Sequence, residues 1–313
     1  FNNHIGLPLT LCRLNEHHRY AVVEMGMSHF GEIDYLTRLA KPTISLITSI
    51  FPCHLEGVGN TLEGVAKAKT EIFKASSDEG VAILNADDSF FQYCRERIGG
   101  KKLLTFSIGS QADVMAKNVR LLSDVSLFDL VVGKEELTIK VPLPGEHNVY
   151  NALAAVSACL AAGVELSMMK KGLQTLLPTS QRLEFKKGFN DCAVIDDSYN
   201  ANPISLARAV DVLERQEHEK ILVVGDMKGL GDSEVDFHIK AGEMLNTKSI
   251  DTVFTIGELA KHISIAYRGN KQHFETKADL IDALKLRCSP ELIILVKASS
   301  GMRLEDVVQG ICR

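Results

Sequence analysis

The chain has 313 residues, of which 45% are hydrophobic and 24% charged, a composition typical of a globular protein large enough for two domains. Its formal net charge of -5 excludes a strongly basic field that would hold nucleic acid or anionic lipid non-specifically, so we expect small-molecule chemistry and no nucleic-acid partner. No apolar run reaches the roughly 18 residues of a membrane span. The seven cysteines are scattered, odd in number and free of C-x-x-C pairs, which favours reduced thiols and a cytoplasmic location.

Short β-branched runs open the chain and alternate with helical patterns. They cover residues 20–26, 43–50, 80–88 and 102–109, and most end in Gly, Asn or Asp. This alternation predicts an α/β unit with a largely parallel sheet. Residues 113–144 then alternate around the turn VGKEE and predict antiparallel strands, and residues 145–164 predict an Ala-rich helix that is closed by Gly163.

A second α/β alternation follows in the last third of the chain. Strands are predicted at residues 192–199, 220–227, 252–257 and 291–299, and a helix at 203–216. This pattern resembles a Rossmann-like domain, whose functional loops lie at the carboxyl ends of the strands. We therefore predict two α/β domains, residues 1–184 and 185–313. The first residues, FNNHIGLPLTLC, lack an initiator Met and already look core-like, so we interpret the chain as a fragment.

Two ionisable side chains follow strand-like runs in the first domain. Glu24 and His54 can approach each other there, because the ends of consecutive parallel strands converge on one edge of the sheet. A divalent cation between them and a plain Glu–His hydrogen bond both remain open, and isolated positions of this kind are more often structural.

A lysine pair lies on the helix that follows. Lys67 and Lys69 are two residues apart and so point to different faces, which leaves Lys69 free to point inward. A buried lysine must be paired, shift its pKa or be chemically modified. The alternative without function is an ion pair with Glu63 or Glu71.

Polar residues also begin two helices. His147, Asn148 and Asn151 start the Ala-rich helix, where they either cap the first turn or contact a planar ligand such as a nucleobase. In DDSYNANP, Asn202 is the expected N-cap before Pro203, while two adjacent acids at a strand end exceed what a turn requires. The stretch VVGDMKGLG contains neither G-x-G-x-x-G nor G-x-x-x-x-G-K-[ST], which argues against a dehydrogenase.

Taken in order, these segments resemble the Mur ligase family. The resemblance rests on FNNHIGLPLTL, VVEMGMSHFGEI, PCHLEGVGNTLEGVAKAKTEIF, LNADD, GEHNVYNALAA, QRLE, DDSYNANP, GDMKGLG with His238 after it, and LVKASSGMRLED. It implies a partial central ATPase domain followed by a Rossmann-like C-terminal domain. It also implies an ATP-dependent ligase that joins D-alanyl-D-alanine to UDP-N-acetylmuramoyl-tripeptide through an acyl phosphate, in peptidoglycan precursor synthesis.

The motif matches imply a role for each site residue. An acid, a histidine and a lysine surround the ATP phosphates in the family and match Glu24, His54 and Lys69. The resemblance implies all three as Mg²⁺ ligands, His54 and Lys69 as catalytic residues, and Lys69 as carbamylated, which would turn a cation into an oxygen ligand of the kind Mg²⁺ prefers. For ATP it implies His147, Asn148 and Asn151 near adenine, Arg182 at the phosphates and Asp197 at the ribose. For the substrates it implies Asn2 and Asn3 near the UDP-sugar, and Tyr199, Asn200, Asn202, Lys297 and Ser299 around D-alanyl-D-alanine.

The chain also departs from the family pattern. A G-x-x-G-K-T-T phosphate loop and a UDP-binding domain are expected ahead of residue 1, and without them we expect this chain to be inactive alone. Ser49 and Gly229 stand where the family commonly has Asn and Glu. We expect a monomer. Two alternatives stay open: a related amide ligase, such as one that extends folate with glutamate, and a non-catalytic nucleotide-binding module.

Overall fold

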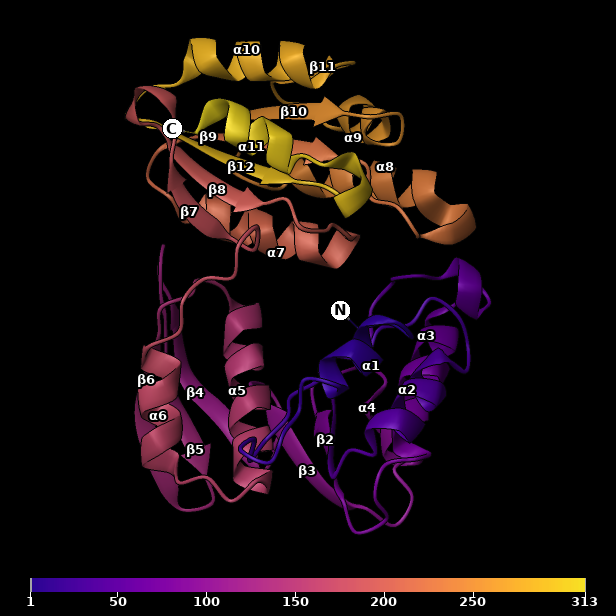
Figure 1. Ribbon diagram of the computed structural model, residues 1–313. Helices are drawn as coiled ribbons and strands as arrows, with labels where there is room; N and C mark the ends of the chain where they lie inside the picture. The colour runs from indigo at the N-terminus through magenta and orange to yellow at the C-terminus, as the bar shows by residue number, and fades with distance from the viewer. Residues whose placement is uncertain (1, 313) are drawn as a thin grey trace. The chain divides into compact units, whose positions relative to one another are not determined.

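The computed structural model describes residues 2–312 and divides into two compact units. The first comprises the residues up to Val119, Leu127–Lys140 and Val149–Gln174; the second comprises Arg120–Ser126, Val141–Asn148 and the residues from Thr175 onward. Each unit contains a six-stranded sheet with helices packed on it (Figure 1). The α/β fold class predicted from the sequence is confirmed. The domain boundary at residue 184 stays a prediction.

The first sheet has its strands in chain order. They are β1 (Ile44–Ile47), β2 (Val81–Asn85), β3 (Lys102–Ser107), β4 (Val114–Leu121), β5 (Ser126–Val132) and β6 (Glu135–Val141). The pairs β1–β2, β2–β3 and β3–β4 are parallel. The neighbours β4, β5 and β6 are joined by turns too short for a parallel crossover and are therefore antiparallel. Both predictions for this region, the parallel part and the antiparallel part, are confirmed.

Six α-helices accompany this sheet. They are α1 (Gly6–Leu11), α2 (Glu32–Ala40), α3 (Leu62–Lys69), α4 (Phe91–Arg95), α5 (Glu146–Ala161) and α6 (Leu166–Gln174). Helix α3 starts at Thr61, whose hydroxyl accepts a hydrogen bond from the amide of Gly64. Helix α5 is the predicted Ala-rich helix, and the chain leaves it through Gly163, at φ 75°, a conformation that favours glycine.

The strand predicted at residues 20–26 is wrong. The segment lies outside all helices and strands, and the side chain of Val22 is 99% exposed. A strand needs a neighbour to pair its N–H and C=O groups. Strand β1 lies at the edge of the sheet and pairs only with β2, so among residues 2–312 nothing forms a ladder with this segment. Glu24 therefore lies in an extended, exposed loop and not at a strand end.

The second sheet is doubly wound. Its order is β11-β10-β9-β12-β8-β7, with β7 (Glu184–Lys187), β8 (Ala193–Asp197), β9 (Glu219–Gly225), β10 (Thr252–Ile256), β11 (Lys271–Phe274) and β12 (Leu292–Lys297). All pairs are parallel except the one between β7 and β8, which is antiparallel. The predicted Rossmann-like arrangement is confirmed. All four strands predicted for this region are present.

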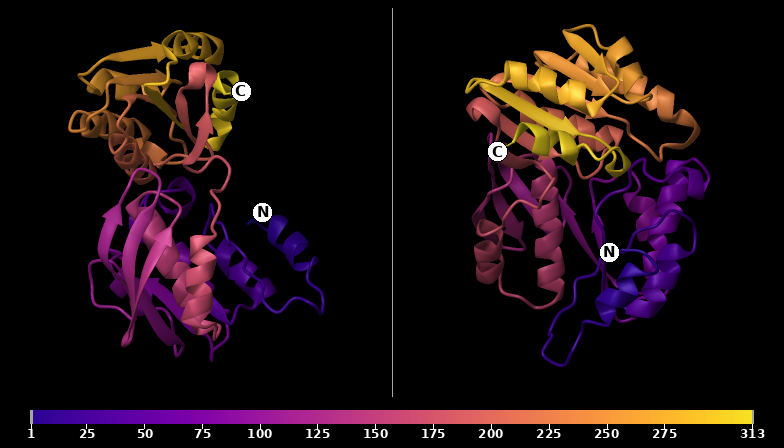
Figure 2. Two further views of the ribbon diagram at one scale, coloured as in Figure 1. Left: turned by 90° about the vertical axis from the view of Figure 1, so that its left-hand side faces the viewer. Right: turned by 45° about the horizontal axis from the view of Figure 1, so that its top comes forward.

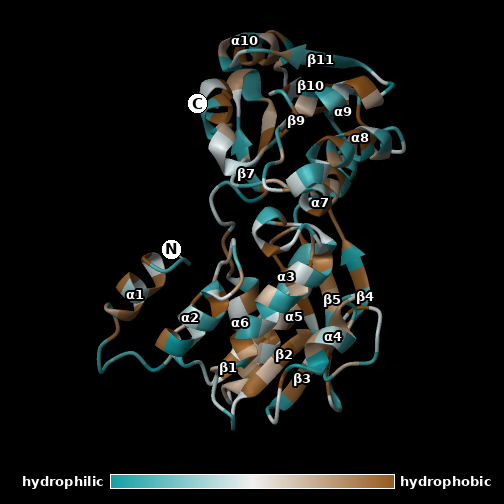
Figure 3. Cartoon of the chain, turned by 90° about the vertical axis from the view of Figure 1, so that its right-hand side faces the viewer, coloured by the Kyte–Doolittle hydropathy of each residue, from teal (hydrophilic) through white to brown (hydrophobic). Residues whose placement is uncertain are grey.

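Five helices cover the two faces of this sheet. They are α7 (Pro203–Glu214), α8 (Glu234–Leu245), α9 (Ala260–Ala266), α10 (Lys277–Arg287) and α11 (Glu305–Ile311). Helices α7, α8 and α9 lie on one face, and α10 and α11 lie on the other (Figures 1 and 2). Alternate residues of the strands pack into two separate apolar clusters, one with each set of helices. The inner strands β8, β9, β10 and β12 are accordingly mostly apolar, whereas the edge strands β7 and β11 are largely hydrophilic (Figure 3). No helix among residues 2–312 has the length and hydropathy needed to cross a bilayer.

Candidate active site

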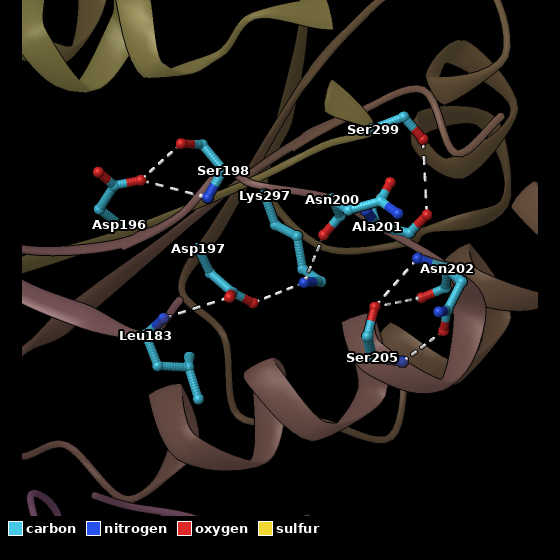
Figure 4. Close-up of polar contacts among 10 residues, drawn as sticks. All are labelled: Leu183, Asp196, Asp197, Ser198, Asn200, Ala201, Asn202, Ser205, Lys297 and Ser299. Atoms are coloured by element: carbon cyan, nitrogen blue, oxygen red, sulfur yellow. Dashed lines mark hydrogen bonds and ion pairs between the residues drawn. The ribbon is translucent and has the colours of Figure 1, made fainter. Parts of the chain in front are cut away.

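The carboxyl ends of β8 and β12 bring together an acid and a lysine. The Nζ of Lys297 lies 2.6 Å from the Oδ2 of Asp197 and 2.9 Å from the carbonyl oxygen of Asn200 (Figure 4). The two strands are parallel neighbours, with Lys297 and Asp197 in register. The side chain of Lys297 is only 3% exposed, so the ion pair compensates a cation that would otherwise be costly to bury. Burial raises the pKa of Asp197, and the charge of Lys297 opposes that rise.

The neighbouring acid has a different partner. Asp196 is 1% exposed, and its Oδ2 lies 2.6 Å from the Nζ of Lys186 on the adjacent strand β7. Its Oδ1 accepts a hydrogen bond of 2.6 Å from the hydroxyl of Ser198. The adjacent acids Asp196 and Asp197 therefore form ion pairs with two different lysines, because consecutive residues of a strand point to opposite faces.

The loop after β8 leads directly into α7. The side chain of Asn202 accepts a hydrogen bond from the amide of Ser205, and the hydroxyl of Ser205 accepts one from the amide of Asn202 (Figure 4). This reciprocal cap, with Pro203 as the first helical residue, confirms the predicted N-cap. Ser299, just past β12, lies 3.5 Å from the carbonyl oxygen of Ala201 and accepts a 2.8 Å hydrogen bond from the amide of Lys228.

The segment before β7 carries Arg182. Its guanidinium carbon lies 4.3 Å from the centroid of the Tyr199 ring, an arrangement typical of a cation–π contact. The residues on both sides, Gln181 and Leu183, have positive φ angles of 61° and 49°. The amide of Leu183 donates to Asp197. Arg182 of the motif QRLE thus lies together with Tyr199 and Asp197 of the motif DDSYNANP.

A buried histidine beneath the β9 loop was not assigned a role from the sequence. His238 is fully buried, its Nε2 accepts a 3.0 Å hydrogen bond from the amide of Met227, and its Nδ1 lies 2.6 Å from the carbonyl oxygen of Glu234. These contacts require a neutral ring with the proton on Nδ1. Burial lowers the pKa of His238, which favours the same neutral state. The histidine thus holds the GDMKGLG loop in place.

The first residues of the chain lie against the segment that carries Glu24. The side-chain amide of Asn2 donates a 2.9 Å hydrogen bond to Oε1 of Glu24, and the carbonyl of Asn2 accepts one from the amide of Gly26. Asn3 accepts hydrogen bonds from the amides of Ile5 and Gly6 at the start of α1. Asn2 and Glu24 thus lie together, whereas the side chain of Asn3 serves the backbone of α1.

Lys69 lies at the end of α3. The residue is half-buried, with its Nζ 5.8 Å from the centroid of the Phe51 ring, whereas Lys67 is exposed, with its Nζ 4.9 Å from the centroid of the Phe30 ring. Burial raises the pKa of the Cys53 thiol, and the nearby Lys69 charge opposes that rise. No ion pair joins Lys69 to a carboxylate among residues 2–312.

The suggestion that Glu71 pairs with Lys69 is wrong. Glu71 is 3% exposed, and its carboxylate accepts hydrogen bonds from the backbone amides of Gly31 and Asp34 at the start of α2. A carboxylate is favoured at this end of a helix, where N–H groups have no partner within the helix. The charge of Glu71 therefore stabilises the N-terminus of α2.

His54 follows β1 after a loop. It is exposed and has a φ of 51°. No hydrogen bond or ion pair joins Glu24, His54 and Lys69 within the described part of the chain. Nor do any three His, Cys, Asp or Glu side chains gather there as a metal centre would require.

The start of α5 carries the remaining predicted residues. Asn148 donates its side-chain amide to the carbonyl oxygen of Pro144, at 2.8 Å, and so ties the first turn to the preceding loop. Asn151, one turn further along, is exposed. Burial lowers the pKa of His147 to about 4, so its ring is neutral at physiological pH.

Two aspartates that the sequence analysis left unassigned organise the strand ends of the first sheet. Asp88 accepts a 2.7 Å hydrogen bond from the amide of Ile50, at the exit of β1. Asp87 accepts hydrogen bonds from residues after β3 and from Tyr150 of α5. The motif LNADD contained the signal, since acids directly after a buried strand need partners.

Comparison with known proteins places this arrangement in context. Residues 1–159 match the model of the Mur ligase middle domain, and residues 181–300 match that of the Mur ligase glutamate ligase domain. The UDP-N-acetylmuramoyl-tripeptide–D-alanyl-D-alanine ligase of Haemophilus influenzae is 38% identical over 317 aligned residues, which cover 99% of this chain and 68% of that protein. The crystal structure of MurF from Acinetobacter baumannii superposes with a TM-score of 0.92 at 33% identity, covering 98% of this chain and 68% of that one. The MurF ligase of Thermotoga maritima, solved in complex with ADP, has the same fold, with a TM-score of 0.86 at 24% identity and coverages of 97% and 70%.

Proposed function

The chain belongs to the Mur ligase family, and we propose from this premise that it is the central and C-terminal part of an ATP-dependent UDP-N-acetylmuramoyl-tripeptide–D-alanyl-D-alanine ligase. The observation that carries the proposal is that the likeness to ligases of this name runs through both units. The expected product is an amide bond in a peptidoglycan precursor.

The reaction has two balanced steps. The tripeptide carboxylate attacks the γ-phosphorus of ATP, which forms an acyl phosphate and releases ADP. The amine of D-alanyl-D-alanine then attacks the acyl carbon, which forms the amide and releases phosphate and a proton. Two anions meet in the first step, so the main demand on the protein is to place positive charge and N–H donors around the phosphates.

Five residues are assigned to the nucleotide. We propose that His147, Asn148 and Asn151 surround the adenine, that Arg182 contacts the phosphates and that Asp197 accepts a hydrogen bond from the ribose. The neutral ring of His147 suits an uncharged base. The guanidinium of Arg182 lies on the Tyr199 ring, which orients its planar fork without consuming its N–H donors.

The dipeptide is assigned to the strand ends of the second sheet. We propose that Tyr199, Asn200, Asn202, Lys297 and Ser299 border it, and that Asn2 and Asn3 face the UDP-sugar. An ammonium group has three N–H donors, and two of those of Lys297 already contact the side chain of Asp197 and the carbonyl oxygen of Asn200. One donor remains for the dipeptide carboxylate.

We propose that Mg²⁺ assists the phosphate chemistry and is held by Glu24, His54 and a carbamylated Lys69. The donors fit in part: Glu24 is an exposed carboxylate, and Lys69 is half-buried without a carboxylate partner among residues 2–312. Neutral Lys69 would add to CO₂ and lose a proton, and the resulting carbamate supplies the oxygen ligands that Mg²⁺ prefers. Bound there, the ion would neutralise phosphate charge.

We further propose that the protein works in the cytoplasm as a monomer. All seven cysteines are free thiols, which suits a reducing compartment. Sedimentation at micromolar concentration should give the mass of one copy.

The decisive experiment measures ADP release by the complete gene product that contains this chain, with ATP, Mg²⁺, UDP-N-acetylmuramoyl-tripeptide and D-alanyl-D-alanine. We expect release only when the dipeptide is present. Replacing the dipeptide by glutamate tests for a related amide ligase, and release with neither amine would leave a nucleotide-binding module.

A matched pair of variants tests the assignment of Lys69. Lys69→Ala should lower kcat by at least about a hundredfold, as expected for the loss of an electrostatic group at the phosphates. Lys67→Ala, on the exposed face of the same helix, should leave kcat unchanged. Removing bicarbonate should lower the activity of the wild-type protein, and adding bicarbonate back should restore that activity. Equal activity of both variants would contradict the assignment.

A further inference from the structure

Asp87 lies two residues after the end of β2 and links three segments that are distant in sequence. Its Oδ2 accepts hydrogen bonds from the amides of Ile108 at 2.7 Å and Gly109 at 3.0 Å, in the loop that follows β3. The hydroxyl of Ser107 lies 2.9 Å from its Oδ1. The hydroxyl of Tyr150, from α5, donates to Oδ2 at 2.9 Å.

These contacts make Asp87 a rigid anchor. Three donors point to its Oδ2, namely the amides of Ile108 and Gly109 and the hydroxyl of Tyr150, and the hydroxyl of Ser107 lies against its Oδ1. Burial acts to raise the pKa of Asp87, but the hydrogen bonds from Gly109, Ile108 and the Ser107 turn outweigh it and hold the pKa well below its usual range. The group is therefore ionised throughout the physiological range, and each hydrogen bond to it is strengthened by its charge.

The buried face of α5 combines large and small side chains. That face includes Val149, Ala152, Leu153, Ala154 and Val156. Apolar contacts have no preferred direction, so a hydrogen bond adds an orientation that apolar packing does not itself specify. The hydrogen bond from Tyr150 has a defined direction and joins α5 to the end of β2. It fixes the rotation of the first turns.

Asn151 immediately follows Tyr150 and is rotated by about 100° around the helix axis. It is exposed, as a residue that contacts a ligand must be. Any rotation of α5 moves Asn151 along an arc, and a planar base tolerates little displacement of its hydrogen-bond partners. Asp87 thus acts on the position of Asn151 without lying next to it in sequence.

We propose that Asp87 is a positioning residue of the nucleotide site, which acts through the hydroxyl of Tyr150 to set the rotation of α5 and so the place of Asn151 against the adenine base. The inference rests on the proposed function, because it takes the base to lie at the start of α5. It assigns no contact between Asp87 and the nucleotide. It also explains why an acid at this strand end contacts a helix as well as the adjoining loop.

The test compares two variants that each remove one hydroxyl from the same carboxylate, in the complete gene product. Tyr150→Phe removes the link to α5 and leaves the loop contacts of Asp87 in place. Ser107→Ala removes a loop contact and leaves the link to α5. Ser107 is fully buried and also accepts a hydrogen bond from the amide of Ser110, so its loss should cost at least as much stability.

We expect Tyr150→Phe to raise the KM for ATP about threefold to tenfold, the equivalent of one hydrogen bond, while kcat and the KM for D-alanyl-D-alanine stay within about twofold. Ser107→Ala should lower the melting temperature and leave the KM for ATP unchanged. Asn151→Ala serves as the reference for direct contact with the base and should raise the KM for ATP at least as much.

Three outcomes separate the possibilities. An unchanged KM for ATP in Tyr150→Phe, with a raised value in Asn151→Ala, overturns the role of Asp87 and keeps the proposed function. An equal rise in Tyr150→Phe and Ser107→Ala also overturns it, since stability alone would then explain both. Wild-type protein without ATP-dependent ADP release overturns the proposed function itself, and the inference with it.

Discussion

Lys297 is a cation held inside the second unit by two acceptors. Its partner Asp197 has a side chain only 12% exposed, so neither charge is hydrated as it would be in the unfolded chain. Their mutual attraction at 2.6 Å offsets that loss. Removing one partner therefore costs more than the pair itself contributes, because the other charge stays buried without compensation.

We expect Lys297→Met to lower the free energy of unfolding by about 3 to 5 kcal/mol. The double variant with Asp197→Asn should recover part of this loss, since both charges are then gone. Urea unfolding measures both values. The control is Lys187→Met: the ammonium of Lys187 lies 3.0 Å from Asp191 with a side chain 70% exposed, so its loss should cost less than about 1 kcal/mol. Similar losses for the two lysines would contradict this account of the buried pair.

The neutral state of His238 makes stability depend on pH. Its pKa is lowered in the folded protein, whereas in the unfolded chain it has the ordinary value of about 6.5. Below that pH the unfolded state binds a proton that the folded state does not. The contribution of His238 to stability is therefore complete above about pH 6.5 and is lost as the pH falls toward the lowered folded value.

We expect His238→Asn to remove this dependence. The free energy of unfolding of the wild-type protein should fall between pH 7 and pH 5 by up to about 1.4 kcal/mol per unit more steeply than that of the variant. His218→Asn, at an exposed position, should keep the wild-type slope. Denaturant unfolding at a series of pH values measures the slopes, and parallel curves for wild type and His238→Asn would refute the prediction.

Local sequence patterns predicted which residues have a structural role better than they predicted which residues these contact. Asn202 was recognisable as a cap because capping depends on local spacing. The pairing of Asp197 with Lys297 spans 100 residues of sequence and follows from the register of β8 and β12, which local patterns do not contain. The same holds for Glu71, whose charge looked available to Lys69 and instead stabilises the start of α2.

At the scale of elements, the start of α7 combines two roles. Asn202 caps the helix, and we assign it also to the dipeptide site. Asn202→Ala should lower the free energy of unfolding by about 1 kcal/mol and raise the KM for D-alanyl-D-alanine. Asn202→Ser retains a good capping oxygen and should restore stability to within a few tenths of a kcal/mol while the KM stays raised. Recovery of the KM together with stability would show that Asn202 acts only as a cap.

Most elements followed from periodicity because they pack in the way that their own patterns demand. Strands β8, β9, β10 and β12 are continuous apolar runs, as expected of strands covered on both faces. Residues 20–26 have the same composition without the same structure. An apolar, β-branched composition favours a strand, but a strand forms only where a neighbouring strand pairs with it. Among residues 2–312, the edge strand β1 pairs with β2 and does not pair with residues 20–26.

At the scale of the molecule, the two units have separate sheets, and the second has its own two apolar clusters. We expect calorimetry to show two heat-absorption transitions, because units with independent cores need not unfold together. Lys297→Met should lower the temperature of only one of them. A single transition, shifted as a whole by this variant, would mean that both units unfold as one.

The two adjacent aspartates at the end of β8 have an evolutionary consequence. Asp196 depends on Lys186 of β7, and Asp197 depends on Lys297 of β12. Neighbours in the chain are therefore subject to unrelated constraints. Across the family, substitutions at position 196 should covary with position 186 and be indifferent to 297, and those at 197 should show the reverse. Positions that are paired across neighbouring strands should therefore be conserved or substituted together, whereas the adjacent positions 196 and 197 should vary independently of each other.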